Sequence, residues 1–478
     1  MFTAEEIVAA THAAPAGENV VRKVFQGVSQ HSKTIKKDEI FIAILGGHFD
    51  GHQFLREAFQ KGAAAAIVQK GKIRPSDFPG KTLFEVSDTL RALGSLACYW
   101  RKKFNIPILG VTGSNGKTTT KDLIAFILGT RMKVHKTSGN ENNLIGLPFS
   151  VLALAQTAQL AIFEMGMSLP FEIQRLAEIL QPTAGLITNI GDTHLEFMKS
   201  RKRVAKAKAA LFLSLPKEGV AFVNDDDPYL KPYADRLRCA VFTYSMKNEQ
   251  ADAYGTIIED RGLAGIDMRC HLKTVKGRPS LSFHLPLPGT HNAMNALAAT
   301  AVSAYYGIRP AHIQQAIESF QATAGRTRVM RLHQGITIID DSYNANPTSM
   351  AQALRLLKES RAGQPKNTAL RTFAVLGDML ELGAKKEQYH QEVGLLLAHY
   401  KIDYVLTLGP LSQYIVETAK RENKTLKAFW TLDQKELITH LKKQLSFESH
   451  AVILVKGSHG MRMDRVSEAL VKAFGKVD

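Results

Sequence analysis

The chain has 478 residues, of which 45% are hydrophobic and 22% are charged, so it exceeds one core of ordinary size and we expect two to four globular domains. It carries 61 basic and 44 acidic residues, a formal net charge of +17 that suits either nucleic acid or anionic small ligands. The basic residues are dispersed and form no RRM, zinc-finger or basic-zipper pattern, so we expect no nucleic-acid partner.

The chain begins with MFTAEEIVAATHAA, which has acidic residues where a signal peptide needs basic ones. No apolar run approaches the roughly 18 residues that a membrane-spanning helix needs, so we expect a cytoplasmic protein without membrane insertion. The three cysteines, Cys98, Cys239 and Cys270, lie far apart and include no CxxC pair. This spacing argues against a disulfide framework and against a zinc site.

Residues 1–86 alternate short strands, at 39–45, 64–69 and 82–86, with one helix at 52–62. The alternation predicts a small N-terminal α/β domain. Asp88 is placed to cap a following helix that runs to residue 104 and has apolar residues at helical spacing. We therefore place the first domain boundary before this helix and assign residues 87–324 to a second domain.

Residues 107–120 read PILGVTGSNGKTTT, which predicts a buried strand, a tight loop and the start of a helix. This is the layout of a phosphate-binding loop, in which backbone N–H groups and a helix N-terminus converge on an anion. Val111 stands where the strict pattern has glycine, so the loop is a shortened variant. It predicts that ATP and Mg²⁺ are bound by Gly113, Ser114, Asn115, Gly116, Lys117, Thr118 and Thr119.

Further apolar strands at 160–163, 185–188 and 219–223 alternate with helical segments, which predicts a mostly parallel sheet. Ligands of such sheets bind beyond the carboxyl ends of the strands, so Glu164 and residues 189–194 are candidates for chemistry. Glu164 is a hard oxygen ligand suited to Mg²⁺, although such a residue can also be a solvated glutamate at a helix start. His194 is a candidate metal ligand or orienting group, although a histidine standing alone is more often structural.

The segment 204–213 is apolar except for Lys206 and Lys208. On a helix these two lysines lie about 200° apart, so they cannot both face one site. Either one of them enters the site or both extend to solvent. Residues 252–287 then look antiparallel, and alanine-rich helices follow at 292–306 and 311–320.

A third alternating unit begins after residue 325, with strands at 336–339, 373–376, 404–408 and 452–455. The expected fold is therefore α/β with three domains: the small N-terminal domain, a central P-loop ATPase-like domain with a parallel sheet, and a Rossmann-like C-terminal domain at 325–478. Candidate ligands stand on both sides of residue 325. We expect the domains to close over ATP and exclude water.

The sequence resembles the Mur ligase family over essentially its whole length. The resemblance is carried by FDGHQF, TGSNGKTTTK, SGNENNLIGLP, EMGMS, ITNIGDTHLE, VAKAK, PGTHNAMNALAA, GRT, DDSYNANP, GDMLELG and VKGSHGMRMDRV, in the family's order. GDMLELG is similar to the branch that adds a dipeptide, and the Asp-Asn-Pro-Arg stretch of the siblings that add a diamino acid is absent. A sibling ligase is the nearer alternative. A P-loop motor or nucleic-acid remodeller is the distant one, and no helicase motif supports it.

The resemblance implies an amide ligase in which a substrate carboxylate takes the γ-phosphate of ATP and the acyl phosphate is then attacked by an amine. It implies that Lys117 and Thr118 serve the phosphates and one Mg²⁺, with Glu164 on the same metal. His194 and a carbamylated lysine at Lys206 would hold a second Mg²⁺. The resemblance also implies that Asn292 and Asn295 contact the adenine of ATP. Arg326 and Asp341 would clamp the nucleotide from across the cleft between the domains.

The implied partners are UDP-N-acetylmuramoyl-tripeptide and D-alanyl-D-alanine, and we expect a monomer. One departure concerns the N-terminal nucleotide contact, where Gln30-His31-Ser32-Lys33 replaces a Thr-Asp-Ser-Arg-like core. Ser32 matches, but lysine offers a point charge where the family has the planar fork of arginine. The expected substrate residues are Ser32, Asn140, Asn143, Ser342, Tyr343, Asn344 and Asn346.

Overall fold

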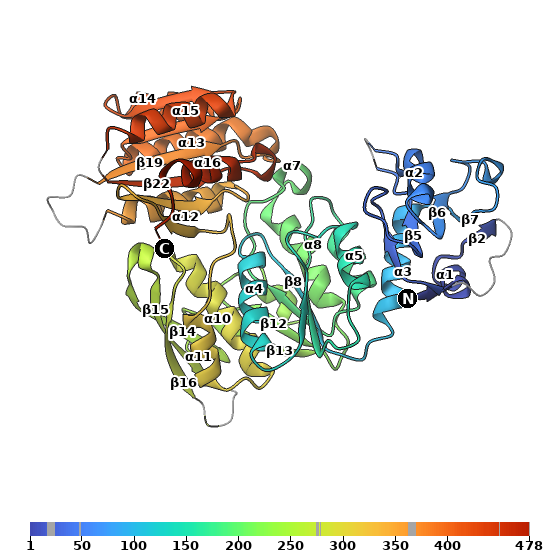
Figure 1. Cartoon of the computed structure of the whole chain (residues 1–478). Coiled ribbons are helices and arrows are strands. Elements are labelled where there is room, and N and C mark those ends of the chain that lie inside the picture. Colours follow the sequence, from blue (N-terminus) through green and yellow to red (C-terminus); the bar gives the residue numbers. More distant parts are fainter. Residues whose placement is uncertain are drawn as a thin grey trace.

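The computed structural model describes residues 1–16, 24–46, 49–273, 277, 279–361, 370–448 and 450–477. These residues form three α/β units, and the fold class expected from the sequence is confirmed. In Figure 1 the N-terminal unit lies at one end of the molecule and the C-terminal unit lies over the central one. Among the described residues, no helix combines the length and apolar character needed to cross a membrane.

The N-terminal unit contains a five-stranded sheet in the order β2-β7-β6-β5-β4, parallel except for β2. Its strands are β2 (Ala14–Ala16), β4 (Gly27–Ser29), β5 (Glu39–Ile42), β6 (Ala65–Gln69) and β7 (Thr82–Val86), beside the short pair β1 (Phe2–Thr3) and β3 (Val24–Phe25). The helical segments are α1 (Ala4–Thr11), η1 (Gly51–Phe54), α2 (Leu55–Gln60) and η2 (Pro75–Asp77). The strand expected at 39–45 ends earlier, and the helix expected at 52–62 is the pair η1 and α2.

Helix α3 (Thr89–Arg101) joins the first two units. Its N-cap is Asp88, whose carboxylate accepts from the Arg91 N–H at 2.9 Å, as the sequence predicts. The helix packs against α1 of the first unit and against α5 (Gly146–Leu152) and α6 (Glu172–Leu180) of the second. A Cβ on Gly94 would lie 2.8 Å from Ile179 Cδ1, so glycine permits this close packing.

The central sheet has the order β16-β15-β14-β13-β12-β11-β8-β10-β9 and is parallel from β9 to β14. Its last strands, β14 to β16, are antiparallel, as expected for this segment. The strands are β8 (Ile108–Thr112), β9 (Val134–Lys136), β10 (Leu160–Glu164), β11 (Ala184–Ile187), β12 (Val220–Asn224), β13 (Ala240–Ser245), β14 (Ala253–Asp260), β15 (Ile266–Leu272) and β16 (Ser280–Leu285). Because β10, β8 and β11 are parallel neighbours, their carboxyl ends share one edge.

Two layers of helices cover this sheet. One apolar core lies under α4 (Lys117–Gly129), α10 (Thr290–Tyr305) and α11 (Pro310–Glu318). The other lies under α5, α6 and α8 (Arg201–Leu213). The short helices α7 (Leu195–Met198), α9 (Lys231–Ala234) and η3 (Gly262–Ala264) lie in the connections. The phosphate loop connects β8 to α4 and therefore stands at the middle of the sheet.

The C-terminal sheet has the order β17-β18-β22-β19-β20-β21 and is parallel except for β17. Its strands are β17 (Arg328–Arg331), β18 (Ile336–Asp341), β19 (Arg371–Gly377), β20 (Tyr404–Leu408), β21 (Lys427–Thr431) and β22 (Ala451–Lys456). One face is covered by α12 (Pro347–Glu359), α13 (Lys386–His399) and α14 (Gln413–Glu422). The other face is covered by α15 (Gln434–Leu445) and α16 (Asp464–Phe474), while η4 (Gly383–Lys385) and η5 (His459–Met461) follow β19 and β22.

Candidate active site

A cavity of about 550 Å³ lies between the central and C-terminal units. Its central lining comes from the loops after β8, β9, β10 and β11 and from α10. Its C-terminal lining comes from the segment before β17, the loops after β18, β19 and β22, and α12. The phosphate loop contributes Ser114, Asn115, Gly116, Lys117, Thr118 and Thr119. The cavity therefore lies at the carboxyl ends of two parallel sheets, where α/β proteins bind ligands.

Gly113 and Gly116 of the phosphate loop lie against different neighbours, and neither position leaves room for a Cβ. Gly116 has φ +78°, and a Cβ there would lie 2.3 Å from Asn295 Oδ1. A Cβ on Gly113 would lie 1.8 Å from Thr188 Oγ1. The Lys117 ammonium folds back and donates to the Gly113 carbonyl at 2.9 Å. Burial lowers the pKa of Lys117, so an anion in this loop would stabilise its charged form.

Glu164 is the last residue of β10, and its side chain reaches the first turn of α4. Its carboxylate accepts from Thr118 Oγ1 at 2.8 Å and from Asn142 Nδ2 at 2.8 Å, and its side chain is buried. A hydroxyl and a carboxylate side by side are hard oxygen donors that fit Mg²⁺. Within the described residues, no group of three or more His, Cys, Asp or Glu side chains is arranged to hold a metal. A cation here would therefore complete its shell with water and phosphate oxygens, as Mg²⁺ commonly does.

The structure corrects the expected role of Lys206. On α8 the side chain of Lys206 is exposed, whereas Lys208 is only 1% exposed. Lys208 donates to the same Gly113 carbonyl as Lys117, at 2.9 Å. Val204, Ala205 and Ala209 are buried like Lys208. Lys208 therefore lies on the face of α8 that packs into the protein, and Lys206 does not. Burial, reinforced by the nearby charge of Lys117, lowers the pKa of Lys208 well below the usual lysine range.

His194 lines the cavity and joins the two units. Its Nδ1 lies 2.6 Å from Oε2 of Glu381, which is on the loop after β19. The hydrogen bond with His194 lowers the pKa of Glu381 below the usual glutamate range. His194 was expected as a metal ligand or orienting group, and its position at the cavity is compatible with both roles.

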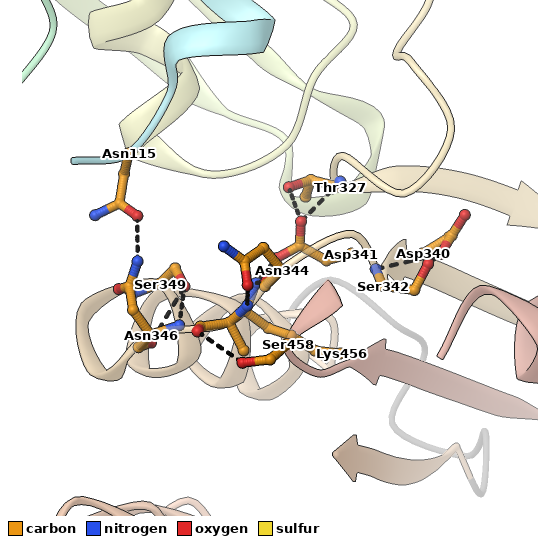
Figure 2. A network of polar contacts seen from close by, with 11 residues as sticks. Asn115, Thr327, Asp340, Asp341, Ser342, Asn344, Asn346, Ser349, Lys456 and Ser458 are labelled. Atoms are coloured by element: carbon orange, nitrogen blue, oxygen red, sulfur yellow. Dashed lines mark hydrogen bonds and ion pairs between the residues drawn. The ribbon is translucent and has the colours of Figure 1, made fainter. Parts of the chain in front are cut away.

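Arg326 and Asp341 approach the site from the C-terminal unit. Arg326 Nη2 donates to Thr118 Oγ1 at 3.0 Å, and the guanidinium lies 3.7 Å from the centre of the Tyr343 ring. Asp341 accepts from the Thr327 N–H at 3.1 Å and pairs with Lys456 Nζ at 2.5 Å. Figure 2 shows Asp341 between the Thr327 segment and the end of β22. Arg326 thus reaches the phosphate-loop helix, while Asp341 is fixed within its own unit.

Asn292 and Asn295 lie on α10, beside the phosphate loop. Asn295 donates to Asn292 Oδ1 at 3.0 Å and accepts from Thr120 Oγ1 at 3.2 Å. Asn292 in turn donates to the Pro288 carbonyl at 2.8 Å. Both asparagines line the cavity, and their contact with adenine stays a prediction.

The expected substrate residues divide into two groups. Five of them line the cavity: Asn140, Asn143, Tyr343, Asn344 and Asn346. Ser32 lies in the N-terminal unit and donates to Glu57 Oε2 at 2.6 Å, away from the cavity lining. Ser342 is buried and donates to Asp340 Oδ1 at 2.5 Å, so its hydroxyl is occupied within the C-terminal unit and the structure does not support substrate contact by it.

Sequence reasoning did not assign two charged residues that shape the site. Lys121 is 1% exposed, donates to the Thr137 carbonyl at 2.9 Å and lies 3.8 Å from Glu164 Oε2. It ties α4 to the loop that carries Asn140 and to the buried carboxylate. The other is Glu381, whose place in GDMLELG was noted without a role. Lys121 follows Lys117 by one helical turn, which was the available signal.

Comparison with known proteins agrees with this geometry. Residues 24–101 match the description "Mur ligase family, catalytic domain", residues 111–303 "Mur ligase middle domain", and residues 325–459 "Mur ligase, glutamate ligase domain". The UDP-N-acetylmuramoyl-tripeptide–D-alanyl-D-alanine ligase of Bacillus subtilis (strain 168) is 36% identical over 468 residues, covering 98% of this chain and 97% of the relative. The chain belongs to the Mur ligase family.

Other members of the Mur ligase family extend the comparison. The ligase of the same name from Escherichia coli (strain K12) is 34% identical, with 90% of each chain covered. A crystal structure of MurF from Acinetobacter baumannii superposes with a TM-score of 0.86 at 28% identity, covering 98% of this chain and 99% of the other. MurF ligase from Thermotoga maritima in complex with ADP gives 0.78 at 26% identity, covering 94% and 97%. The family resemblance read from the sequence is confirmed.

Proposed function

We propose that this chain joins D-alanyl-D-alanine to UDP-N-acetylmuramoyl-tripeptide at the expense of ATP, through an acyl phosphate. The observation that carries the proposal is the shared cavity, where Arg326 reaches Thr118 across the boundary between units. The names of the relatives support the same substrates. The sibling that adds a diamino acid is the remaining alternative within the family, and the nucleic-acid remodeller has no support from the comparisons.

The first step transfers the γ-phosphoryl group of ATP to the terminal carboxylate of the tripeptide. A carboxylate oxygen forms the new bond to phosphorus as the bond to ADP breaks. Lys117 stands in the phosphate loop and would turn from the Gly113 carbonyl to the transferred phosphoryl group. Arg326 would add its charge from the opposite wall. Both cations therefore oppose the negative charge that develops in the transition state.

In the second step the amine of the dipeptide attacks the acyl carbon, phosphate leaves, and the amine loses a proton. Activation is needed because a free carboxylate is a poor electrophile. The polar side chains of Asn344 and Asn346 line the C-terminal wall, from which the amine would approach. Holding both reactants in one closed cavity would supply proximity and keep water from the acyl phosphate.

We propose that two Mg²⁺ ions act with ATP in this cavity. Thr118 and Glu164 would hold one, and His194 with a modified Lys208 would hold the other. When bound, Mg²⁺ would offset phosphate charge during transfer. The modification is a carbamate: Nζ of neutral Lys208 bonds to the carbon of CO₂ and loses one proton. The product is an anionic oxygen ligand, and the lowered pKa of Lys208 makes the neutral amine that reacts accessible.

We propose that the UDP end of the acceptor binds to the N-terminal unit, around Ser32. We also propose that the three domains comprise residues 1–86, 87–324 and 325–478. The substrates and ATP are metabolites of the cytoplasm, which is the location we propose. We also propose that the chain acts as a monomer.

The test is ATP turnover by the full-length chain with UDP-N-acetylmuramoyl-tripeptide and a panel of amines. We expect turnover with D-alanyl-D-alanine far above that with D-alanine, L-alanyl-L-alanine or a free diamino acid. Polar groups left unpaired by a wrong amine cost about 1–3 kcal/mol each, so each mismatch should lower kcat/KM about 5- to 150-fold. Comparable turnover with meso-diaminopimelate or lysine on a UDP-muramoyl-dipeptide would favour the sibling ligase.

A further inference from the structure

One side-chain hydrogen bond closes the edge of the cavity between the central and C-terminal units. Nδ1 of His194 and Oε2 of Glu381 lie 2.6 Å apart, although the two residues are 187 positions apart in the chain. The side chain of His194 is 23% exposed and that of Glu381 is 45% exposed. Both residues line the cavity. The contact therefore belongs to the site and forms only where the two units meet.

The backbone holds both partners in place. His194 and Glu381 have φ of +54° and +60°, a left-handed conformation that is uncommon for residues other than glycine. The Glu196 N–H donates to the Glu381 carbonyl at 3.3 Å. A Cβ on Gly383 would lie 2.9 Å from the Glu196 Cα, so the two loops touch closely. Strained backbone supported from both sides in this way is typical of functional sites.

The hydrogen bond to Glu381 also decides which imidazole nitrogen of His194 is available. Because Nδ1 is engaged by the carboxylate, Nε2 is the nitrogen left for a ligand of His194. Histidines that bind metals usually have their other nitrogen held by a carboxylate or carbonyl, which fixes the ring orientation and raises ligand basicity. The Glu381 carboxylate is placed to hold Nδ1 of His194 in this way. Among the described hydrogen bonds and ion pairs, it has no other side-chain partner.

We infer that Glu381 is a positioning residue that orients His194 for the second cation. The inference rests on the proposed function, in which His194 holds that cation. Glu381 belongs to the C-terminal unit, so the second cation site is complete only when the two units are closed. Binding of the second cation and closure must then favour each other by the same factor, because linkage is reciprocal. The first cation, at Thr118 and Glu164, does not depend on Glu381.

The experiment measures Mn²⁺ binding to the full-length chain with a non-hydrolysable ATP analogue, by electron paramagnetic resonance. We expect two bound ions in the wild-type protein. Glu381→Ala should weaken the second ion about 10- to 100-fold and leave the first unchanged. Glu381→Gln should lie between, because its amide oxygen still accepts from Nδ1–H. Glu392→Gln, an exposed residue bonded to Gln388, is the control and should behave as wild type.

Closure is followed on the same samples by small-angle scattering, with thermal melting to confirm folding. Mn²⁺ should promote compaction of the wild-type complex, and this metal dependence should be lost in Glu381→Ala. Two results would overturn the inference: a second ion bound by Glu381→Ala as tightly as by wild type, or unchanged metal-dependent compaction. If His194→Ala also keeps the second ion, the metal role of His194 in the proposed function fails as well. If His194→Ala loses it and Glu381→Ala keeps it, only this inference fails.

Discussion

The side-chain amide of Asn346, at the start of α12, donates to Oδ1 of Asn115 in the phosphate loop at 2.7 Å. Figure 2 shows the two side chains meeting across the boundary between the units. Asn346 also caps α12, accepting from the Ser349 N–H at 2.9 Å, so its position is fixed by its own unit. The phosphate loop therefore contacts a residue that the helix cap of the C-terminal unit holds in place.

We expect Asn115→Ala and Asn346→Ala to lower kcat/KM for ATP non-additively. Each variant breaks the same contact, so a double-mutant cycle should give a coupling energy of about 0.5–3 kcal/mol. Asn346→Asp separates the two roles of this residue, because aspartate still caps the helix but cannot donate to Asn115. Strictly additive single and double variants would show that the contact does not contribute to the reaction.

We expect Lys208→Ala to lose activity about 10²- to 10³-fold, the range found when one electrostatic stabiliser of a transition state is removed. Lys206→Ala is the matched control on the same helix and should stay near wild type, because its side chain is exposed. Short-chain carboxylic acids should partly restore Lys208→Ala by replacing the carbamate oxygens. An inactive Lys206→Ala beside an active Lys208→Ala would contradict the assignment.

Comparing Gly116→Ala with Gly71→Ala separates the effect of backbone strain from the effect of a steric clash of the new Cβ. Both glycines have φ +78°, so alanine costs each about 1–2 kcal/mol of stability. Only at Gly116 would the new Cβ meet a neighbour, Asn295 Oδ1 at 2.3 Å, whereas Gly71 faces open space. We expect nucleotide affinity, measured by calorimetry, to fall about tenfold or more in Gly116→Ala alone, equivalent to about 1.4 kcal/mol. An equal loss in Gly71→Ala would point to general destabilisation.

Asp403 should make the stability of the C-terminal unit dependent on pH. Burial raises the pKa of this carboxyl, but hydrogen bonds from Thr372 and the charge of Arg361 outweigh burial and lower it below the ordinary value. The stabilisation is therefore present above the unfolded pKa, about 3.9, and is lost as pH falls through the folded value. Asp403→Asn should lower the free energy of unfolding by about 1–3 kcal/mol at pH 7.

Urea unfolding at a series of pH values tests the sign of this effect. The difference between wild type and Asp403→Asn should shrink as the pH falls below about 4, where the wild-type carboxyl becomes protonated. The exposed Asp235→Asn is the control and should change stability little at any pH. A difference that grows with acidity would contradict the assignment.

The local pattern of the sequence predicted the elements that carry chemistry. The strand, glycines and lysine around Lys117 predicted the phosphate loop, and the apolar run before Glu164 placed this carboxylate at the end of a neighbouring strand. Helical periodicity showed that Lys206 and Lys208 face different ways but did not decide which one enters the site. That choice depends on which helix face packs on the sheet, where the burial of Val204 and Ala209 gives the answer.

Contacts between the units could not be predicted from the sequence. The pairing of His194 with Glu381 depends on how two separately folded sheets meet, and no local pattern encodes that orientation. The orientation of Ser342, whose contact with substrate stays a prediction, was hidden from the sequence for a related reason. DDSYNANP predicted a polar loop at the cavity, but the turn directs Ser342 inward to Asp340 and presents Tyr343 and Asn344 to the cavity.

The position of α3 between the first two units has a consequence for how the protein unfolds. Buried residues of the N-terminal sheet, such as Phe84, belong to the same apolar cluster as Leu96 of α3 and Leu176 of the central unit. The C-terminal sheet has its own two clusters, which contain Leu376 on one face and Ile453 on the other. Heat should therefore melt the chain as two cooperative blocks, with the N-terminal and central units in a single calorimetric transition and the C-terminal unit in another.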